Sequence, residues 1–231
     1  MINVDRVYQR VLLLANKEQR GYITPQEFNL FANQAQMDIF EQYFYDLNQF
    51  LRVTGNSTMH ADVVDILEEK ISVFETTKSL ALANNAGNLN TLNRFYRLSN
   101  VRRGNILLES VSRKDFRLFQ NSPLAAPTIA RSIYTVNSLS NVLTVAGGSF
   151  AGVDIDYIQE PELVNWTYVV VKGKALYNAN ALDNKDFQLH PSEETELVLK
   201  ILTLAGFTLK DANLYQAAEK EDTKNIQQEK Q

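Results

Sequence analysis

The chain has 231 residues, 45% of them hydrophobic, which is enough to bury the core of one large domain or two small ones. Its formal net charge of −4 gives no overall attraction to nucleic acid or to an anionic membrane. The absence of cysteine excludes disulfides, thiolate metal sites and cysteine nucleophiles.

The composition also bears on membranes and on subunit contacts. No apolar run approaches the ~20 residues of a membrane-spanning helix, and the first residues lack the pattern of a secretory signal peptide. We therefore expect no membrane partner. Asparagine and glutamine are frequent, and two explanations stay open: AT-rich codons, or hydrated, amide-rich contacts between subunits.

A short helix is predicted first, with Asn3 as its N-cap and apolar residues over Val4–Leu12. The connector that follows, Asn16–Glu27, has the glycine and the final glutamate of an EF-hand calcium loop. Arg20 stands where a ligand oxygen is expected, and its charge opposes cation binding. We favour a helix that ends at Gly21 and is followed by a capping box.

The longest helical pattern runs from Thr24 to Leu51. Thr24, Pro25 and Glu27 form the expected capping box with proline at the first helical position. Apolar residues then recur at three- and four-residue steps, which predicts one wide apolar face that the helices at both chain ends could cover. The apolar positions are Phe28, Phe31, Ala32, Ala35, Ile39, Phe40, Phe44, Leu47, Phe50 and Leu51.

Two further helical blocks are predicted. The first covers His60–Ala83, with Val63, Ile66, Leu67, Ile71 and Phe74 on its apolar face. The second begins after His190, with Ser192 as N-cap and Gly206 as its end, and another helix is expected from Leu209 or Lys210.

Short β-type runs fill the region between these blocks. Ser112 is the expected cap of a short helix over Arg113–Phe119. The candidate strands are Phe95–Leu98, Asn105–Leu108, Ile129–Val136, Val142–Val145, Val153–Ile158 and Thr167–Val171.

This order predicts an α+β fold in which a helical layer made from both chain ends carries an inserted, mainly antiparallel β-module. The expected boundaries are 1–84 for the N-terminal helical part, 85–189 for the β-module, 190–218 for the C-terminal helical part and 219–231 for a polar tail. We expect the tail to be mobile in the free protomer and ordered against a neighbouring subunit; a solubilising end without a partner is the alternative.

Catalytic signals are weak, and no enzyme activity, cofactor or metal is predicted. The glycine-rich segment 147–152 misses the spacing of a serine nucleophile elbow and is interpreted as a hairpin turn. Two histidines are too few for a histidine metal cluster, and His190 is interpreted as a structural loop residue. Asp154 and Asp156 share one strand face, which we interpret as the solvated side of a half-buried strand.

One stretch, 94–117, is locally basic and has aromatic residues among its cations: Phe95, Tyr96, Phe116 and Phe119. Such a surface can contact an acidic neighbour, track DNA or simply be solvated, and we favour the acidic neighbour. The predicted subunit or ring contacts are Arg94, Arg97, Arg102, Arg103, Arg113, Glu193, Glu194, Glu219, Glu221, Ile226, Gln227 and Gln228.

Several segments in the same order carry a family resemblance: GYITPQEFNLFANQAQMDIFEQYF near the start, FYRL at 95–98, NSPLAAPTIARSIY at 121–134, DYIQEPELVNW, and DFQLHPSEETELVLKILTLAGFTL at 186–209. Together they resemble the ring or adaptor proteins of tailed bacteriophages, with the closest likeness to the crAss-like phages with short tails.

The resemblance implies a virion structural protein, made in the bacterial host cytoplasm, that forms a closed ring in the neck or tail barrel below the portal. The implied symmetry is twelvefold, and the implied partners are other copies of the chain, the portal protein or neighbouring tail rings, and DNA passing non-specifically through the channel. Two other hypotheses stay open: an adaptor or assembly factor outside the virion, and a carboxylate-based hydrolase.

Overall fold

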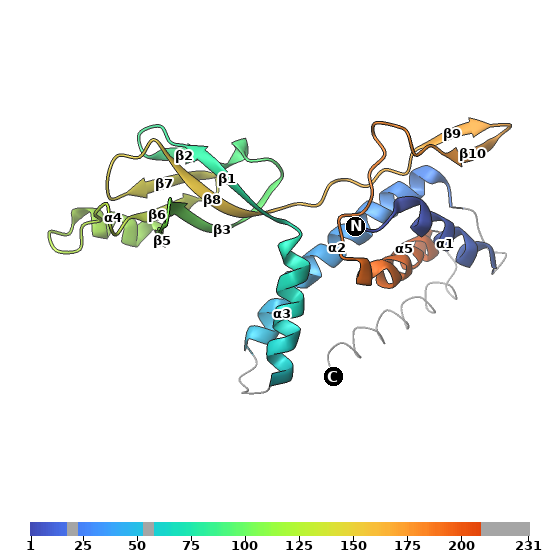
Figure 1. Ribbon diagram of the computed structural model, residues 1–231, viewed down its shortest axis with the longest axis horizontal. Helices are drawn as coiled ribbons and strands as arrows, with labels where there is room; N and C mark the ends of the chain where they lie inside the picture. The colour runs from blue at the N-terminus through green and yellow to red at the C-terminus, as the bar shows by residue number, and fades with distance from the viewer. Residues whose placement is uncertain (18–22, 53–57, 209–231) are drawn as a thin grey trace. The chain divides into compact units, whose positions relative to one another are not determined.

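The computed structural model of the protein describes residues 1–17, 23–52 and 58–208, and it confirms the α+β class (Figure 1). The chain divides into two compact units: a helical unit, Met1–Val73 together with the chain from Pro161 onward, and a β-unit, Phe74–Glu160, inserted between its halves. The helices are α1 (Val4–Lys17), α2 (Pro25–Arg52), α3 (Thr58–Ser72), η1 (Leu89–Thr91), α4 (Arg113–Asn121), η2 (Pro191–Glu193) and α5 (Glu194–Thr208). The strands are β1 (Glu75–Ala81), β2 (Ala86–Asn88), β3 (Phe95–Arg103), β4 (Ile106–Leu107), β5 (Glu109–Ser110), β6 (Ile133–Asn137), β7 (Val142–Ala146), β8 (Gly152–Gln159), β9 (Tyr168–Val171) and β10 (Lys174–Tyr177).

Both predicted N-caps at the start of the chain are present. Asn3 accepts a hydrogen bond from the amide of Arg6 at 3.0 Å, which caps α1. At α2 the Thr24 hydroxyl accepts from the amide of Glu27, while the Glu27 carboxylate accepts from the Thr24 amide at 2.9 Å. This reciprocal capping box lowers the pKa of Glu27.

The apolar face of α2 forms much of the core of the helical unit. Phe28, Ala32, Ala35, Ile39 and Phe40 are buried, and α2 contacts both α3 and α5, which confirms that helices from the two ends of the chain form one layer. Phe31, Phe44 and Leu47 are only half-buried, and the side chain of Leu51 lies outside the described residues.

A second face of α2 is polar and holds an extended segment of the chain. Asn29, Asn33 and Gln36 hydrogen-bond to main-chain groups of Trp166, Val164 and Glu162, respectively. These three amides lie one helical turn apart, while their targets are every second residue of an extended segment. We call this arrangement the amide ladder.

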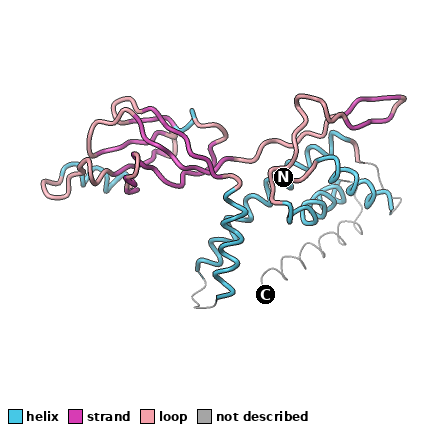
Figure 2. Tube along the Cα trace, in the orientation of Figure 1, coloured by secondary structure: helices cyan, strands magenta, loops and turns pink. Residues whose placement is uncertain are grey.

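The β-unit contains two sheets that share one core. The strand order is β1-β8-β3-β4 in one sheet and β2-β7-β6-β5 in the other, and all pairs are antiparallel except β5 with β6. Inward-facing residues from both sheets, among them Ile155, Tyr157, Leu143 and Val145, belong to one buried cluster. The coil and strand segments of this unit can be followed in Figure 2.

Helix α4 covers the outer face of the second sheet. Ser112 caps it as predicted, accepting from the amide of Asp115. Phe116 packs against Ile133 and Ala146, whose neighbours along the strands face the inner core, as the two-residue period of a strand requires.

The inserted unit has different boundaries from those predicted. The block His60–Ala83 is not one helix, because α3 ends at Ser72 and Glu75–Ala81 forms β1. The backbone of β1 pairs along its length with β8, so tertiary pairing outweighs the local helical pattern. The inserted unit therefore spans Phe74–Glu160 rather than 85–189, and β9 belongs to the helical unit. Ile66 was placed on the apolar face but is 52% exposed.

Three predicted element ends also differ. His190, not Ser192, is the N-cap where the helical segment begins, because its ring accepts from the amide of Ser192 in η2, which leads into α5. Helix α5 continues past Gly206 to Thr208. The segment 147–151 is not a hairpin turn, because the strands on either side, β7 and β8, belong to different sheets. Gly147 has φ +122° there, and an added Cβ would lie 2.5 Å from the Thr128 carbonyl oxygen.

Several predictions concern residues outside those that the structure describes. They are the central part of the Asn16–Glu27 connector, the helix expected from Leu209 or Lys210, and the tail 219–231.

Candidate functional site

The hairpin of β9 and β10 in the helical unit carries several exposed apolar side chains close together. The two strands pair antiparallel, with Val171 opposite Lys174 and Tyr168 opposite Tyr177. The turn residues Lys172 and Gly173 have φ +51° and +76°. Positive φ at both central residues is the requirement of a type I′ turn, whose twist matches that of paired strands.

The base of the hairpin is held by a buried tryptophan. The Trp166 side chain is 1% exposed and stacks with the rings of Tyr168 and Tyr177 at centroid distances of 5.7 and 5.9 Å. Its indole nitrogen donates to Asp5 on α1 at 2.9 Å, and its ring also contacts Tyr8. The hairpin therefore projects from a base fixed to α1 and α2.

One face of the hairpin is apolar and open to solvent. Cross-strand partners share a face, so Val169, Val171, Lys174 and Leu176 lie together, opposite the face that carries the two tyrosines. Val169 is 50% exposed, Val171 46% and Leu176 52%. We call these four residues the hairpin face.

The hairpin suits contact with another protein surface. Its two strands pair with no third strand among the described residues, so their outer edges offer free backbone groups. An isolated two-stranded ribbon is only marginally stable in water, and an exposed cluster of valine and leucine is typical of an interaction site. Lys172 and Lys174 give its tip a positive charge, with no acidic residue between 167 and 178.

The sequence analysis predicted β9 but did not identify the hairpin as a site. A usable signal was present: Lys172-Gly173 separates two runs of strand-forming residues, YVVV and ALY, that carry no negative charge.

The predicted basic contact surface lies in the β-unit, and its aromatic residues face inward. Phe116 is 6% exposed, and Phe95 packs against the core residue Tyr157. They are therefore not available as a stacking platform for bases. Phe119 packs beside Phe116, while Tyr96 is half-buried.

The arginines of that surface differ in their surroundings. Arg102 pairs with Asp156 at 3.3 Å, Arg103 lies 5.1 Å from the centre of the Phe150 ring, and Arg94 donates to Gln159. Arg97 and Arg113 are exposed. The other predicted contacts, Glu219, Glu221, Ile226, Gln227 and Gln228, lie outside the described residues.

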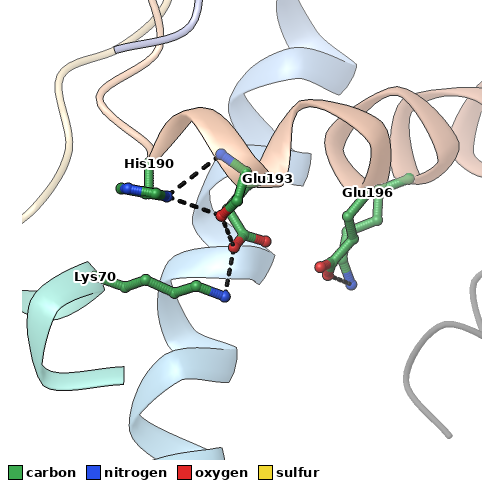
Figure 3. Close-up of polar contacts among 6 residues, drawn as sticks. Lys70, His190, Glu193 and Glu196 are labelled. Atoms are coloured by element: carbon green, nitrogen blue, oxygen red, sulfur yellow. Dashed lines mark hydrogen bonds and ion pairs between the residues drawn. The ribbon is translucent and has the colours of Figure 1, made fainter. Parts of the chain in front are cut away.

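Glu193 and Glu194 are used inside the helical unit. The Glu193 carboxylate is 2.6 Å from the Lys70 ammonium and also accepts from the Ser192 hydroxyl, whose oxygen is 2.8 Å from the His190 ring (Figure 3). Because Glu193 is 3% exposed, its predicted role as a surface contact is not supported.

Glu194 is also satisfied within the unit, since its carboxylate pairs with Arg6 at 3.0 Å and with Arg10 at 2.8 Å. These pairs fix the start of α5 against α1.

Asp154 and Asp156 have the surroundings of an ordinary strand face. Each accepts a hydrogen bond from a hydroxyl on β1, Ser79 for Asp154 and Thr77 for Asp156. Val153, Ile155 and Tyr157 on the opposite side are buried, as predicted. Within the described residues, no group of three or more histidine or acidic side chains is placed to hold a metal ion.

No protein-family model matches the chain, and no curated protein is significantly similar to it.

None of the helices in the described part of the chain combines the length and apolar composition that a bilayer crossing requires.

Proposed function

We propose that this protein is a structural subunit of a closed ring in the neck or tail of a tailed bacteriophage virion, where other copies of the chain are its first partners. The portal protein and neighbouring tail rings are the partners above and below it. The proposal rests on the resemblance of five segments to ring and adaptor proteins, together with the hairpin described above.

The observation that carries the proposal is the exposed hairpin face on a fixed base. When another subunit covers the three half-exposed apolar side chains of this hairpin, their removal from water contributes roughly 25 cal/mol for each Å² of apolar surface buried. Because the contacts of Trp166 fix the base of the hairpin, the hairpin loses less conformational entropy on binding than a free ribbon would.

A ring subunit needs two different side surfaces that meet head to tail around the axis. The helical unit is well suited to present them, because ion pairs join α1 to α5 and α3 to η2, and the amide ladder joins α2 to the segment that leads into the hairpin. The net charge of −4 gives the chain no overall affinity for DNA, which suits a passage through which DNA must move.

The mass of the purified protein tests the proposal. Sedimentation velocity and mass photometry should find one dominant assembly whose mass is a whole multiple of the 26.3 kDa protomer. Replacing Val169 and Leu176 together with Ser should shift the protein toward protomers, because it removes apolar area from the hairpin face.

The control is Leu139→Ser in the β-unit, where a leucine that is even more exposed (97%) lies outside the hairpin. It should assemble like the wild type. A wild-type protein that remains a protomer at every concentration tested would contradict the proposal.

A further inference from the structure

Helix α3 carries a second exposed surface in the helical unit, and it differs in charge from the hairpin. Ile66 is 52% exposed and Val73, just beyond the helix end, is 50% exposed. Asp65 and Glu69 are exposed on the same side, at positions next to Ile66 on a helix of 3.6 residues per turn. We call Asp65, Ile66, Glu69 and Val73 the α3 face.

The α3 face is acidic, and the lysine of this helix, Lys70, is turned away from it. Lys70 points to the buried carboxylate of Glu193 and lies 5.7 Å from the centre of the Tyr43 ring, with its side chain only 16% exposed (Figure 3). Glu68, also exposed, adds a further negative charge beside the face.

The two faces complement each other. Each presents a small apolar cluster, made of Val169, Val171 and Leu176 on the hairpin and of Ile66 and Val73 on α3. Positive charge adjoins the first cluster and negative charge the second, so docking would bury apolar area while placing Lys172 and Lys174 near carboxylates.

Contact between the two faces within one chain is prevented by the length of α2. The hairpin base is bound at Asn29, near the start of α2, whereas α3 packs beside Tyr43 through Lys70. At ~1.5 Å per residue these points are roughly 20 Å apart along the helix, and the hairpin extends from the end away from α3 (Figure 1).

We propose that the hairpin face of one copy docks on the α3 face of the next copy, forming the head-to-tail contact of the ring. The inference depends on the proposed function for the closure of the ring, but the contact itself needs only a second copy of this chain. Two different faces at opposite ends of one unit make a heterologous interface, which repeats around an axis and does not stop at a dimer.

Disulfide trapping tests the contact, and the natural chain has no cysteine to interfere. The variant Val169→Cys with Ile66→Cys should give a ladder of cross-linked oligomers on mild oxidation, read on a non-reducing gel. Mixing the two single variants should give a cross-linked dimer and nothing larger.

The matched control moves the hairpin cysteine to the other face. Val170 is the next residue, is 62% exposed and shares its face with the tyrosines. Val170→Cys with Ile66→Cys should cross-link more slowly, on the order of tenfold, because docking raises the effective concentration only for thiols that face each other.

Charge reversal gives an independent readout. Lys174→Glu and Glu69→Lys should each lower the assembled fraction at low salt. Mixing the two variants should restore assembly, because the new glutamate at 174 of one variant then faces the new lysine at 69 of the other.

The outcomes separate this inference from the proposed function. The docking contact would be overturned if the Val169→Cys and Val170→Cys variants cross-linked to Ile66→Cys at the same rate. It would also be overturned if Val169→Cys cross-linked to itself as fast as to Ile66→Cys. Both results would count even if the wild type assembles into a large species by mass. A monomeric wild type without any cross-linked product would overturn both.

Discussion

The side-chain amide of Asn33 satisfies both main-chain polar groups of Val164: the Val164 amide donates to Oδ1 at 2.7 Å, and Nδ2 donates to the Val164 carbonyl at 3.0 Å. A helix face here takes the place of a neighbouring β-strand. Successive amides of the helix can reach every second residue of the extended segment because the two spacings are similar: a helical turn rises ~5.4 Å and two strand residues span ~6.6 Å. The different lengths of the asparagine and glutamine side chains make up for the difference. The ladder leads directly into the hairpin base at Trp166, where Asn29 repeats the pattern.

Removing the side-chain amide of Asn33, the middle residue of the amide ladder, should therefore lower the free energy of unfolding. Asn33→Ala leaves two main-chain groups of Val164 without their partner, at about 1–3 kcal/mol for each group that stays dry. Urea unfolding should show a loss of roughly 2–4 kcal/mol in the free energy of unfolding. Asn48→Ala is the control: the exposed Asn48 amide donates to the Phe44 carbonyl of its own helix, and its removal should change the free energy of unfolding by no more than about 0.5 kcal/mol. Equal losses for both variants would show that the ladder adds nothing to stability.

The ladder also answers part of the question raised by composition. Codon usage and subunit contacts are the two explanations open for the frequent asparagine and glutamine. Asn29, Asn33 and Gln36 have a different role, because their side-chain amides bind main-chain groups within the same chain. A sequence pattern could not reveal this, because their partners lie more than a hundred residues away.

The aromatic residues of α2 should differ in their contributions. Phe40 is fully buried, whereas Phe44 is half-buried beside it, with ring centres 5.1 Å apart. Phe40→Ala should cost ~3–5 kcal/mol, as for a buried ring, and Phe44→Ala should cost clearly less. Chemical denaturation of both variants checks this. A smaller loss for Phe40→Ala than for Phe44→Ala would mean that the core is not where the structure places it.

Local patterns could predict the helices that carry caps and long apolar stripes, since α1, α2 and α4 depend mainly on residues close in sequence. They failed at the ends of α3 and α5 and at β1. At β1 the helical spacing of the preceding residues continues as far as Phe74, and only pairing with β8, more than seventy residues later, determines that the chain becomes a strand.

The site could be predicted only in part, for the same reason. The run YVVV indicated a strand. Whether its side chains are exposed depends on whether other segments of the chain pack on them, and no local pattern encodes this. Glu193 was predicted as a surface contact because it begins the acidic run 193–196, yet it is buried and its carboxylate pairs with Lys70 on α3.

The pair of Lys70 and Glu193 should be sensitive to removal of one partner. Lys70→Ala leaves a buried carboxylate without its counter-charge, and the cost for such pairs is up to about 3–5 kcal/mol. The double variant Lys70→Met with Glu193→Leu should recover much of that loss, because two apolar groups need no counter-charge. Thermal unfolding of the three proteins measures this. Full stability in Lys70→Ala alone would contradict the burial of the pair.

Glu27 gives a pH-dependent prediction. The Thr24 amide and hydroxyl, which donate to the Glu27 carboxylate, hold its pKa below the ordinary value of 4.5. Because the pKa is lower in the folded state, the capping contact stabilises the fold above pH 4.5, and this stabilisation is lost as the pH falls through the folded-state pKa. Glu27→Gln should therefore be less stable than the wild type at neutral pH, and the difference should shrink below pH 4.5. Urea unfolding at several pH values checks this, and a difference that grows on acidification would have the wrong sign.

Assembly geometry is tested most directly by negative-stain electron microscopy of the purified wild-type protein, with averaged end-on views. Head-to-tail docking of the hairpin face on the α3 face predicts closed rings around a central opening, with the same rotational symmetry in every particle and twelvefold symmetry if the family resemblance holds. Rings should disappear from the Val169→Ser, Leu176→Ser double variant and persist in Leu139→Ser. Two-fold dimers or isolated protomers in the wild type, at concentrations where the protein is well folded, would contradict it.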